Sequence, residues 1–253
     1  MSCVNIRGYC IGEGRPKVII PIVEPTETAV LEKAAEFSTL RADCVEWRID
    51  CFEGAKDLPA IVHCAAKLRV ALKDQLLLFT FRTKSEGGKV ALAHEEYLHF
   101  IRTVFATDCA DLIDIEFFTA GADLPGLIED AHTAGVKVVC SSHDFHKTPP
   151  CAELVSRMTA MQEAGADLPK LAVMPTCRAD VIALLAATAE MADHHPETPV
   201  ITMSMGTLGA VSRLCGEAFG SAMTFANPGA ASAPGQVPLD VVNEVLESLH
   251  AER

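Results

Sequence analysis

A lysine and a histidine in otherwise apolar surroundings are the residues best suited to act on a carbonyl compound. Lys170 lies in the run Leu-Pro-Lys-Leu-Ala-Val-Met-Pro. Burial in such a run disfavours the charged ammonium, and a neutral amine attacks ketones to form a Schiff base. His143 ends the run Val-Val-Cys-Ser-Ser-His, and histidine is the usual general acid and base near neutral pH. The alternative for Lys170 is the exposed start of a strand, as expected for Lys17 and Lys137.

Charged residues accompany two further apolar runs. In Cys-Val-Glu-Trp-Arg-Ile-Asp, Glu46 and Arg48 alternate with Trp47 and Ile49, so on a strand the two pairs would face opposite sides. We expect the apolar pair to face covering helices and the charged pair to face the interior. Arg82 ends the next run, where its guanidinium would hold carboxylates or hydroxyls. A structural salt bridge for the first pair and an exposed loop position for Arg82 are the alternatives.

A glycine-rich turn later in the chain is typical of an anion site. Gly206 and Gly209 follow an apolar run and would let the backbone approach a ligand where a helix begins. Arg213 lies on the first turns of that helix, and Met203 and Met205 would supply an apolar wall. The turn therefore predicts a binding site for an anionic ligand.

Acidic and histidine pairs elsewhere carry weaker signals. Asp114 and Glu116 share the inward parity of their run, which favours packing or an ion network over catalysis. His143 and His146 have a spacing that could suggest metal ligands, but the run lies off a helix and offers no other clear ligand. We therefore expect no metal.

The elements that must position these residues alternate regularly. Short β-rich runs are separated by alanine-rich segments with helical periodicity, such as 26–41, 91–107 and 179–193. A strand–helix unit repeated eight times predicts a (β/α)8 barrel, whose functional residues lie at the carboxyl ends of the strands. An open doubly wound sheet is the alternative, but no G-x-G-x-x-G follows the first run. The eight runs are 18–23, 44–50, 76–82, 112–117, 137–145, 168–175, 200–206 and 223–226.

Three stretches outside the repeat complete the expected architecture. No Pro/Gly/Ser-rich linker divides the chain, which predicts one domain over residues 1–253. About sixteen residues precede the first run and are expected to form a hairpin that closes the barrel floor. The Gly/Pro/Ala-rich stretch 227–238 lies where barrel enzymes keep a lid, with Ser232 and Gln236 as its neutral hydrogen-bond partners.

Composition excludes several classes of protein. The net charge is −13, from 21 Lys+Arg and 34 Asp+Glu, which argues against a nucleic-acid partner. No apolar run reaches the length of about 20 residues that a membrane helix needs, and the first residues do not resemble a signal or transit peptide. We therefore expect a cytosolic protein. The ten cysteines contain no C-x-x-C, and we interpret them as reduced, mostly buried small hydrophobes.

Seven motifs, in chain order, together resemble the type I 3-dehydroquinate dehydratase family. The match runs from the first β-rich segment to Gln236, nearly the whole chain, with the motifs at the strand ends, so a coincidence of fold alone is a poor explanation. The motifs are E-W-R-I-D, F-T-F-R-T-K-x-E-G-G, D-I-E, S-S-H-D-F, K-L-A-V-M-P, M-S-M-G-x-x-G-x-x-S-R and A-S-A-P-G-Q.

The resemblance implies a (β/α)8 barrel, commonly a homodimer, that uses no metal or organic cofactor. It implies dehydration of the anion 3-dehydroquinate to 3-dehydroshikimate and water, a step in chorismate and aromatic amino-acid synthesis. Lys170 would form the imine, His143 would be the general acid and base, and Glu86 would orient His143. The substrate-binding residues that it implies are Glu46, Arg48, Arg82, Phe145, Met203, Met205, Arg213, Ser232 and Gln236.

The implied chemistry agrees with these residue types. A protonated imine accepts the electrons released when an α-proton leaves, so a base as weak as histidine suffices. Three arginines would give local positive potential in an acidic protein. One departure is Pro21, at the end of the first run, which offers no side-chain donor.

Other readings stay open at this point. A lysine-dependent aldolase would share the barrel and the imine but gives no reason for the histidine and arginine set. A metal-dependent hydrolase would need inward ligands on several strands, and a non-catalytic binding protein should have lost Lys170 or His143. Biosynthesis and quinate breakdown are both compatible with the sequence.

Overall fold

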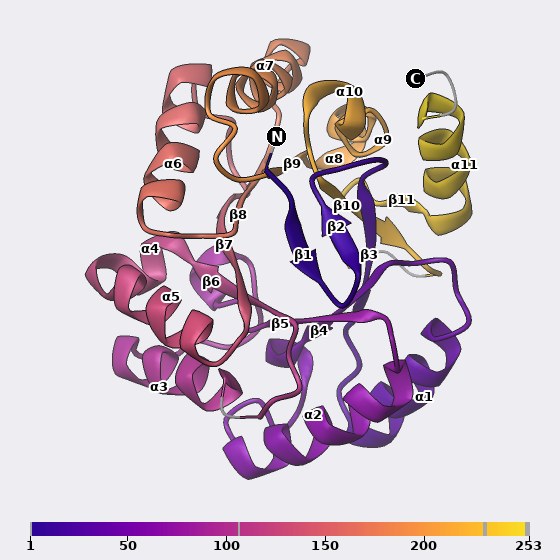
Figure 1. Cartoon of the computed structure of the whole chain (residues 1–253), viewed down its shortest axis with the longest axis vertical. Helices are drawn as coiled ribbons and strands as arrows, with labels where there is room; N and C mark the ends of the chain where they lie inside the picture. The colour runs from indigo at the N-terminus through magenta and orange to yellow at the C-terminus, as the bar shows by residue number, and fades with distance from the viewer. Residues whose placement is uncertain (1, 106, 230–231, 251–253) are drawn as a thin grey trace.

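The computed structural model describes residues 2–105, 107–229 and 232–250. Within these ranges, eight parallel strands follow one another around a barrel, and helices form an outer ring (Figure 1). The strands pair in chain order, and the last of them pairs back onto the first. The predicted (β/α)8 barrel is confirmed, with strands β3 (Lys17–Ile22), β4 (Cys44–Arg48), β5 (Leu76–Thr80), β6 (Leu112–Glu116), β7 (Lys137–Asp144), β8 (Leu168–Val173), β9 (Ile201–Ser204) and β10 (Met223–Asn227).

The barrel closes between β9 and β10 through few backbone contacts. Val200 and Ser221 form an isolated parallel bridge, and the Ala222 amide donates to the Val200 carbonyl at 2.8 Å. The Thr202 amide donates to the Ser221 hydroxyl at 3.1 Å, so a side chain replaces a ladder bond. A further short strand, β11 (Val237–Pro238), pairs with the end of β10. The sequence did not predict it, because two residues leave no alternation to recognise.

Helices cover the outside of the strands, and their ends differ from the expected ranges by a few residues. After β9 the expected single helix is divided into three short ones, because glycines at 206, 209 and 216 weaken a continuous helix. The helices are α1 (Glu27–Phe37), α2 (Leu58–Leu72), α3 (His94–Phe105), α4 (Phe117–Ala120), α5 (Leu124–Thr133), α6 (Cys151–Glu163), α7 (Arg178–His194), α8 (Gly206–Gly209), α9 (Val211–Leu214), α10 (Gly216–Phe219) and α11 (Leu239–His250).

The strands bury apolar residues on both faces, as parallel strands under helices do. Outward-facing residues pack under the helices. Trp47 is one of them, and its ring contacts the rings of Phe52 and Phe79 edge-on. Inward residues such as Ile19 and Leu78 fill the lower barrel in a second cluster. The expected parity of β4 is therefore confirmed, with Trp47 outside and its charged neighbours inside.

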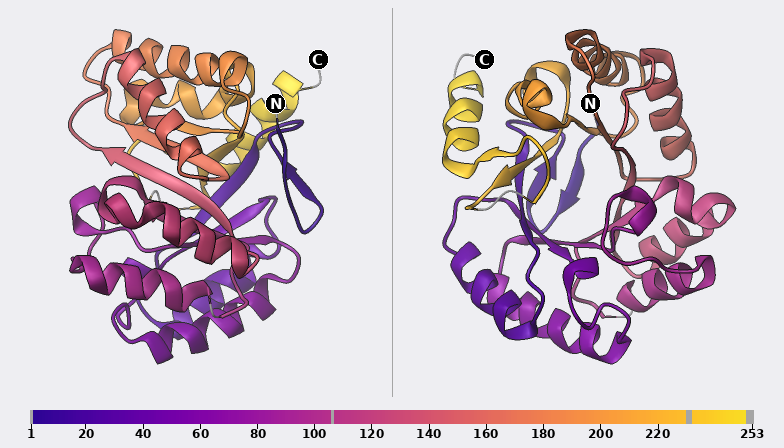
Figure 2. Two further views of the ribbon diagram at one scale, coloured as in Figure 1. Left: turned by 60° about the vertical axis from the view of Figure 1, so that its left-hand side comes forward. Right: turned by 180° about the vertical axis from the view of Figure 1, so that it is seen from behind.

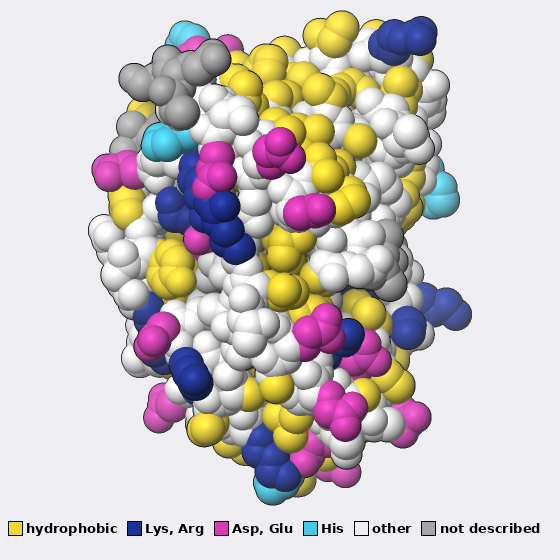
Figure 3. All heavy atoms as spheres, turned by 90° about the vertical axis from the view of Figure 1, so that its right-hand side faces the viewer, with side chains coloured by type: hydrophobic (Ala, Val, Ile, Leu, Met, Phe, Trp, Pro, Cys, Tyr) yellow, Lys and Arg dark blue, Asp and Glu magenta, His cyan; other side chains and the backbone are white. Residues whose placement is uncertain are grey.

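The exterior combines acidic groups with local apolar surface. Val211 on α9 and Val241 and Leu249 on α11 are exposed. In the view onto α11, hydrophobic side chains form a band among acidic groups (Figure 3). In the described part of the chain, no helix has the length and apolarity needed to cross a membrane.

An antiparallel hairpin, β1 (Val4–Ile6) with β2 (Tyr9–Ile11), lies at the amino-terminal end of the barrel strands. The side view shows it outside that end of the barrel (Figure 2). Val4 and Ile11 pack onto the cluster that fills the lower barrel. The expectation that the first residues close the barrel floor is confirmed.

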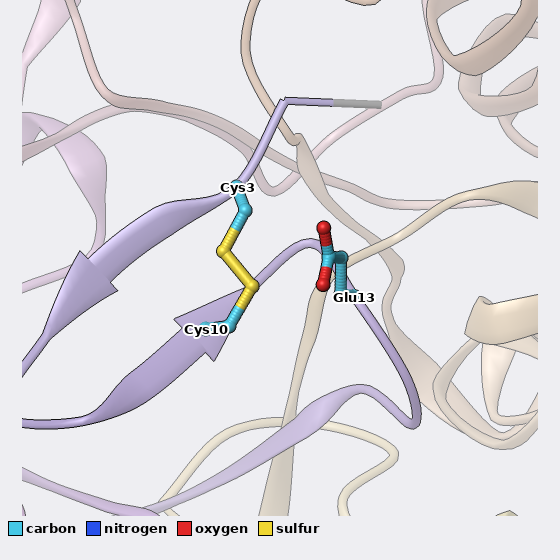
Figure 4. Close-up of side chains that lie close together, drawn as sticks. All are labelled: Cys3, Cys10 and Glu13. Carbon is cyan, nitrogen blue, oxygen red and sulfur yellow. A yellow bond between two sulfur atoms is a disulfide. The ribbon is translucent and has the colours of Figure 1, made fainter.

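The expectation that all cysteines are reduced is wrong for the hairpin, where Cys3 and Cys10 form a disulfide (Figure 4). The antiparallel pairing brings their Cα atoms to 5.6 Å, within the range that a disulfide spans. A separation of seven residues gives no sign of this until the hairpin register is known. The other eight cysteines are free. Five of these are buried, as expected: Cys44, Cys51, Cys64, Cys109 and Cys140.

Candidate active site

A cavity of about 240 Å³ lies at the carboxyl ends of the barrel strands. All twelve site residues expected from the sequence line it, although they come from six strands and their following loops. The lining also includes Gly87, Ala172, Ala233 and Pro234, which belong to the quoted motifs but were not expected as site residues, and Phe225, which lies outside the motifs. The twelve expected residues are Glu46, Arg48, Arg82, Glu86, His143, Phe145, Lys170, Met203, Met205, Arg213, Ser232 and Gln236.

Lys170 lies inside the barrel, not at an exposed strand start. Its side chain is 3% exposed, and its Nζ atom lies 2.9 Å from Asp114 Oδ2 and 4.7 Å from the centre of the Phe225 ring. The ring adds a π face that attracts a cation. The ion-network role expected for Asp114 is confirmed, but its partner is the candidate nucleophile. Phe225 was missed because it lies in an ordinary apolar strand.

His143 and Glu86 form a pair beside this lysine in the cavity lining. Glu86 Oε2 lies 2.8 Å from His143 Nδ1 and accepts the His143 backbone N–H at 3.0 Å. Burial, reinforced by the Arg82 and Lys170 cations, lowers the pKa of His143 well below its usual value. Burial also raises the pKa of Glu86 to about 8, against the effect of Arg82. The ring is thus held neutral, and the contact at Nδ1 leaves Nε2 available to a ligand.

A tight loop brings Glu86 to this position. The 3-10 turn Lys84–Glu86 follows β5, and the Gly88 amide returns to the Thr83 carbonyl at 2.8 Å. A Cβ atom at Gly88 would collide with the backbone carbonyl of Arg82. The loop can therefore fold back only with glycine at this position.

Arg82 is a buried hub and not a free binding group. Its guanidinium lies 2.8 Å from Asp114, 3.0 Å from Glu116 and 3.6 Å from Glu86, and Nη1 donates to Ser141 Oγ at 3.0 Å. Burial alone would raise the pKa of Asp114, but Arg82 and Lys170 hold it well below its usual range. The arginine therefore joins these acidic side chains and keeps Asp114 ionised.

The expectation that three arginines make the site positive is wrong for two of them. Arg48 donates from Nε and Nη2 to both oxygens of Asp50, at 2.8 and 2.9 Å, and Arg82 faces three carboxylates. Parity placed Arg48 inside correctly, and Arg82 lies at the end of its run as expected, but the sequence pattern carries no information about the partners of either guanidinium. Glu46, which also lines the cavity, accepts from Thr80 Oγ1 at 2.8 Å.

Arg213 is the cation in this cavity with no carboxylate partner among the described residues. It is 2% exposed, and burial lowers its pKa to about 10. Its contacts are weak ones, with Met203 Sδ at 3.6 Å and the Pro234 carbonyl at 3.3 Å, and its Nε is buried without an acceptor. A buried, unsatisfied guanidinium facing a cavity is suited to bind an anion.

Ser232 and Gln236 lie over the cavity on the segment after β10. The Ser232 amide donates to Gln236 Oε1 at 2.8 Å, and Gln236 Nε2 donates to Ser232 Oγ at 3.0 Å. Gly235 packs directly on Gly206, whose amide donates to the Pro234 carbonyl at 3.2 Å. Of the expected lid 227–238, residues 230 and 231 lie outside the described residues.

Pro21 and one group of potential metal ligands have no part in the cavity. Pro21 is buried in β3 opposite Glu46, outside the lining. Among the described residues, one group of three potential metal ligands is found, Cys3, Cys10 and Glu13 at the barrel floor, and its two sulfurs are bonded to each other. Figure 4 shows the Glu13 carboxylate beside them.

Comparisons with known proteins agree with this geometry. The family model for type I 3-dehydroquinase matches residues 18–253. The chain is 46% identical over 250 residues to a 3-dehydroquinate dehydratase of Bacillus subtilis strain 168, covering 99% of this chain and 98% of that protein.

Two solved structures are similar over nearly their whole length. The type I 3-dehydroquinate dehydratase of Clostridium difficile, solved with covalently modified comenic acid, gives a TM-score of 0.97 at 42% identity and covers 100% of both chains. The 3-dehydroquinate dehydratase of Geobacillus kaustophilus gives 0.95 at 35% identity, covering 99% of this chain and 97% of that one. Since the family model, the relatives, the barrel and the motifs that line its cavity all agree, this chain belongs to the type I 3-dehydroquinase family.

Proposed function

We propose that this protein is a 3-dehydroquinate dehydratase that acts through a Schiff base on Lys170. The observation that carries the proposal is a buried amine lining one cavity with a neutral histidine and an unpaired guanidinium. These groups correspond to a nucleophile, a base and an anion receptor. Family membership supports the substrate.

Substrate binding follows from the charges that are left uncompensated. Arg213 receives the carboxylate, because Arg48 and Arg82 are already engaged by acidic side chains. Ser232 and Gln236 complete this end of the cavity with neutral hydrogen bonds. Glu46 has one oxygen engaged by Thr80 and accepts from a ring hydroxyl with the other. Met203, Met205 and Phe145 pack against the ring.

The chemistry begins at the ketone. Lys170 Nζ forms a C–N bond to the carbonyl carbon, the carbonyl oxygen leaves as water with two of the three ammonium protons, and an imine that keeps the third proton remains. His143 Nε2 then takes the α-proton, and the electron pair moves into the imine. The β-hydroxyl departs as water with the proton from His143, and a second water hydrolyses the imine. The balance is 3-dehydroquinate to 3-dehydroshikimate plus one water.

Histidine suffices as the base because the imine lowers the cost of removing the proton. Its low pKa keeps the ring neutral and able to accept. Proton transfer by a placed base contributes about 10²–10⁴-fold to a rate. Glu86 holds the ring through Nδ1 and faces the imidazolium that forms.

Two measurements test the proposal. Addition of 3-dehydroquinate should produce the ultraviolet absorbance of a conjugated enone, which an aldolase or a binding protein would not give. Borohydride added with substrate should leave a stable adduct on Lys170 in peptide mass mapping, and Lys170→Met should prevent it. Lys137→Met, a matched lysine at the start of β7, should keep the adduct. An adduct on another lysine would reject the assignment.

Chelation provides a separate test of the absence of a metal requirement. The polar lining consists of three arginines, Lys170, Ser232 and Gln236, together with one histidine and two carboxylates that already have protein partners. We expect activity to survive exhaustive EDTA treatment. Loss on chelation with recovery on adding zinc or manganese would overturn the mechanism.

We further propose, from the family resemblance, a cytosolic homodimer that serves aromatic biosynthesis. Exposed Val211, Val241 and Leu249 offer apolar surface for a second copy. Light scattering should give twice the mass of the 27.0 kDa chain, and cell fractionation should recover the protein with cytosolic markers. The gene should restore growth without aromatic amino acids to a strain that lacks this dehydratase. Failure to do so, in an expressed active protein, would favour quinate breakdown.

A further inference from the structure

The candidate nucleophile is held by a carboxylate that the reaction scheme above does not use. Asp114 is fully buried on β6, and its Oδ2 atom lies 2.9 Å from Lys170 Nζ and 2.8 Å from Arg82 Nη2. Its Oδ1 atom accepts from Ser141 Oγ at 2.6 Å. Three donors therefore fix this side chain before any substrate enters.

No other acid near the cavity is available to Lys170 among the described residues. Glu116 accepts from Thr83 and Thr119, at 2.7 and 2.6 Å, and from Arg82. Glu86 holds His143, and Glu46 holds Thr80. Asp114 is the carboxylate that contacts Nζ.

The charge of Asp114 does not depend on the proton of Lys170. Arg82 stays cationic throughout, and it contacts the same Oδ2 atom. Asp114 therefore stays ionised when Lys170 loses a proton to become a nucleophile. Of the other titratable groups nearby, Glu86 and Glu116 also face Arg82, and His143 lies on the neighbouring strand β7.

Resting on the Schiff base proposed above, we infer that Asp114 is the counter-ion of the imine nitrogen on Lys170. Its carboxylate keeps the imine protonated and receives its N–H. An imine nitrogen carries one proton where the ammonium carried three, so a single acceptor at this position also fixes which side the substrate carbon occupies. The ring then extends away from β6 into the cavity.

Protonation of the imine decides the rate of the next step. A neutral imine accepts electrons poorly, so the α-proton leaves slowly. In a dry interior an unpaired cationic imine would tend to lose its proton, and an ion pair at hydrogen-bond distance opposes this. Arg82 and Ser141, which hold Asp114 in place, are positioning residues for the same task.

The test is the pH dependence of kcat in Asp114→Asn, which keeps the shape and an acceptor oxygen but removes the charge. We expect kcat to fall about 100-fold, with a smaller change in KM. We also expect a new limb in the profile, on which kcat decreases with rising pH as the imine loses its proton. A merely structural role would lower activity without adding that limb.

Two variants provide controls. Ser141→Ala removes a hydrogen bond to Asp114 but keeps the carboxylate, so it should lose activity without the new limb. Asp111→Asn removes a buried carboxylate immediately before the first residue of β6, far from the cavity end of that strand. The Asp111 carboxylate pairs with Arg7 and Arg69. The substitution should lower stability and leave the profile unchanged.

The outcomes separate this inference from the proposed function. If the unaltered protein gives no borohydride adduct on Lys170, the Schiff base itself is wrong. If the adduct forms and Asp114→Asn keeps the original kcat and profile, only the counter-ion role is overturned. If Asp114→Asn does not fold, the unaltered protein labelled with ¹⁵N at lysine Nζ decides. Its product imine should stay protonated through the neutral and mildly alkaline range, and titration there would overturn the inference.

Discussion

At the residue scale, the cavity assigns separate tasks to separate charges. Lys170 and Arg213 are both buried cations, but only the first has a carboxylate partner within the described part of the chain. An ion pair stabilises a charge that the protein itself carries, whereas an unpaired guanidinium binds a charge brought by a ligand. In the proposed reaction the two cations therefore cannot exchange roles.

Loss of His143 and loss of Lys170 should stop the reaction at different steps. His143→Ala should still form the imine and accumulate a covalent complex, because amine attack does not require that base. Lys170→Ala should bind substrate reversibly and form no adduct. Both should lose about 10³-fold or more in turnover, while His146→Ala, an exposed neighbour, should be unaffected. Intact-protein mass after a single turnover is the measurement, and near-normal turnover in His143→Ala would contradict the base assignment.

The raised pKa of Glu86 predicts a limb in the pH profile of kcat/KM. Above about 8 Glu86 is ionised, and its carboxylate then stabilises the imidazolium that His143 becomes. kcat/KM should therefore rise as the pH approaches 8. Glu86→Gln should lack this limb and lose about 10²-fold, and Glu53→Gln, an exposed control, should keep it. If Glu86→Gln shows the same rise of kcat/KM toward pH 8, the rise reports the ionisation of another group.

At the element scale, loops and not strands complete the cavity. The strands place Glu46 and Lys170 by parity, but Glu86 comes from the loop after β5 and Arg213 from the short helix α9. Ser232 and Gln236 come from the segment after β10. Their positions depend on close backbone contacts, such as that of Gly88 with Arg82 and that of Gly235 with Gly206.

Gly235→Ala should displace the segment that carries Ser232 and Gln236. Its φ is +75°, and a Cβ atom there would collide with the backbone of Gly206. The Pro234 carbonyl would then leave Arg213, so KM should rise about tenfold or more, an energetic change of roughly 1.4 kcal/mol. Gly229→Ala is the matched control, since a Cβ atom there meets nothing within 4 Å. Steady-state kinetics decide, and an unchanged KM in Gly235→Ala would show that the contact is dispensable.

At the scale of the whole molecule, the buried charges that serve the proposed reaction oppose folding. The pKa of Glu86 is raised from 4.5 to about 8, so its contribution to stability is present below pH 4.5 and lost as the pH rises through 8. Glu86→Gln should therefore unfold at a higher temperature than the original protein at pH 9, with little difference at pH 4. Thermal unfolding at both pH values checks this. A variant less stable at pH 9 would mean that the ionised carboxylate is stabilising.

The disulfide at the barrel floor should act in the opposite direction. Closing the loop between Cys3 and Cys10 contributes about 2 kcal/mol by constraining the unfolded chain. Reductant, or Cys3→Ser, should therefore lower the unfolding temperature, while Cys177→Ser, at an exposed free cysteine, should not. One domain over residues 1–253 predicts a single cooperative transition in each case. Two transitions would contradict the single domain, and an unchanged melting temperature would contradict the stabilising role of the disulfide.

The sequence by itself determined the barrel and which side chains face its interior. Eight runs separated by helical segments predict the strand order, and the alternation of Glu46 and Arg48 with Trp47 and Ile49 predicts the inward face. These properties are local, since each depends on neighbouring residues and on a period of two. The motifs went further and identified Glu86 beside His143, but by resemblance and not by spacing.

Only the tertiary structure decided which of these groups meet. Asp114 and Lys170 are 56 residues apart, and Glu86 and His143 are 57 apart, so each pair depends on the stagger of neighbouring strands and on how a loop folds back. The same is true of the hairpin disulfide and of the carboxylates around Arg82. A local pattern records the side on which a residue lies but not its height along the barrel axis. Two buried charges become partners only when their side chains lie at the same height in the folded barrel. The tertiary structure therefore also decides that Arg213 is the cation left free for a ligand.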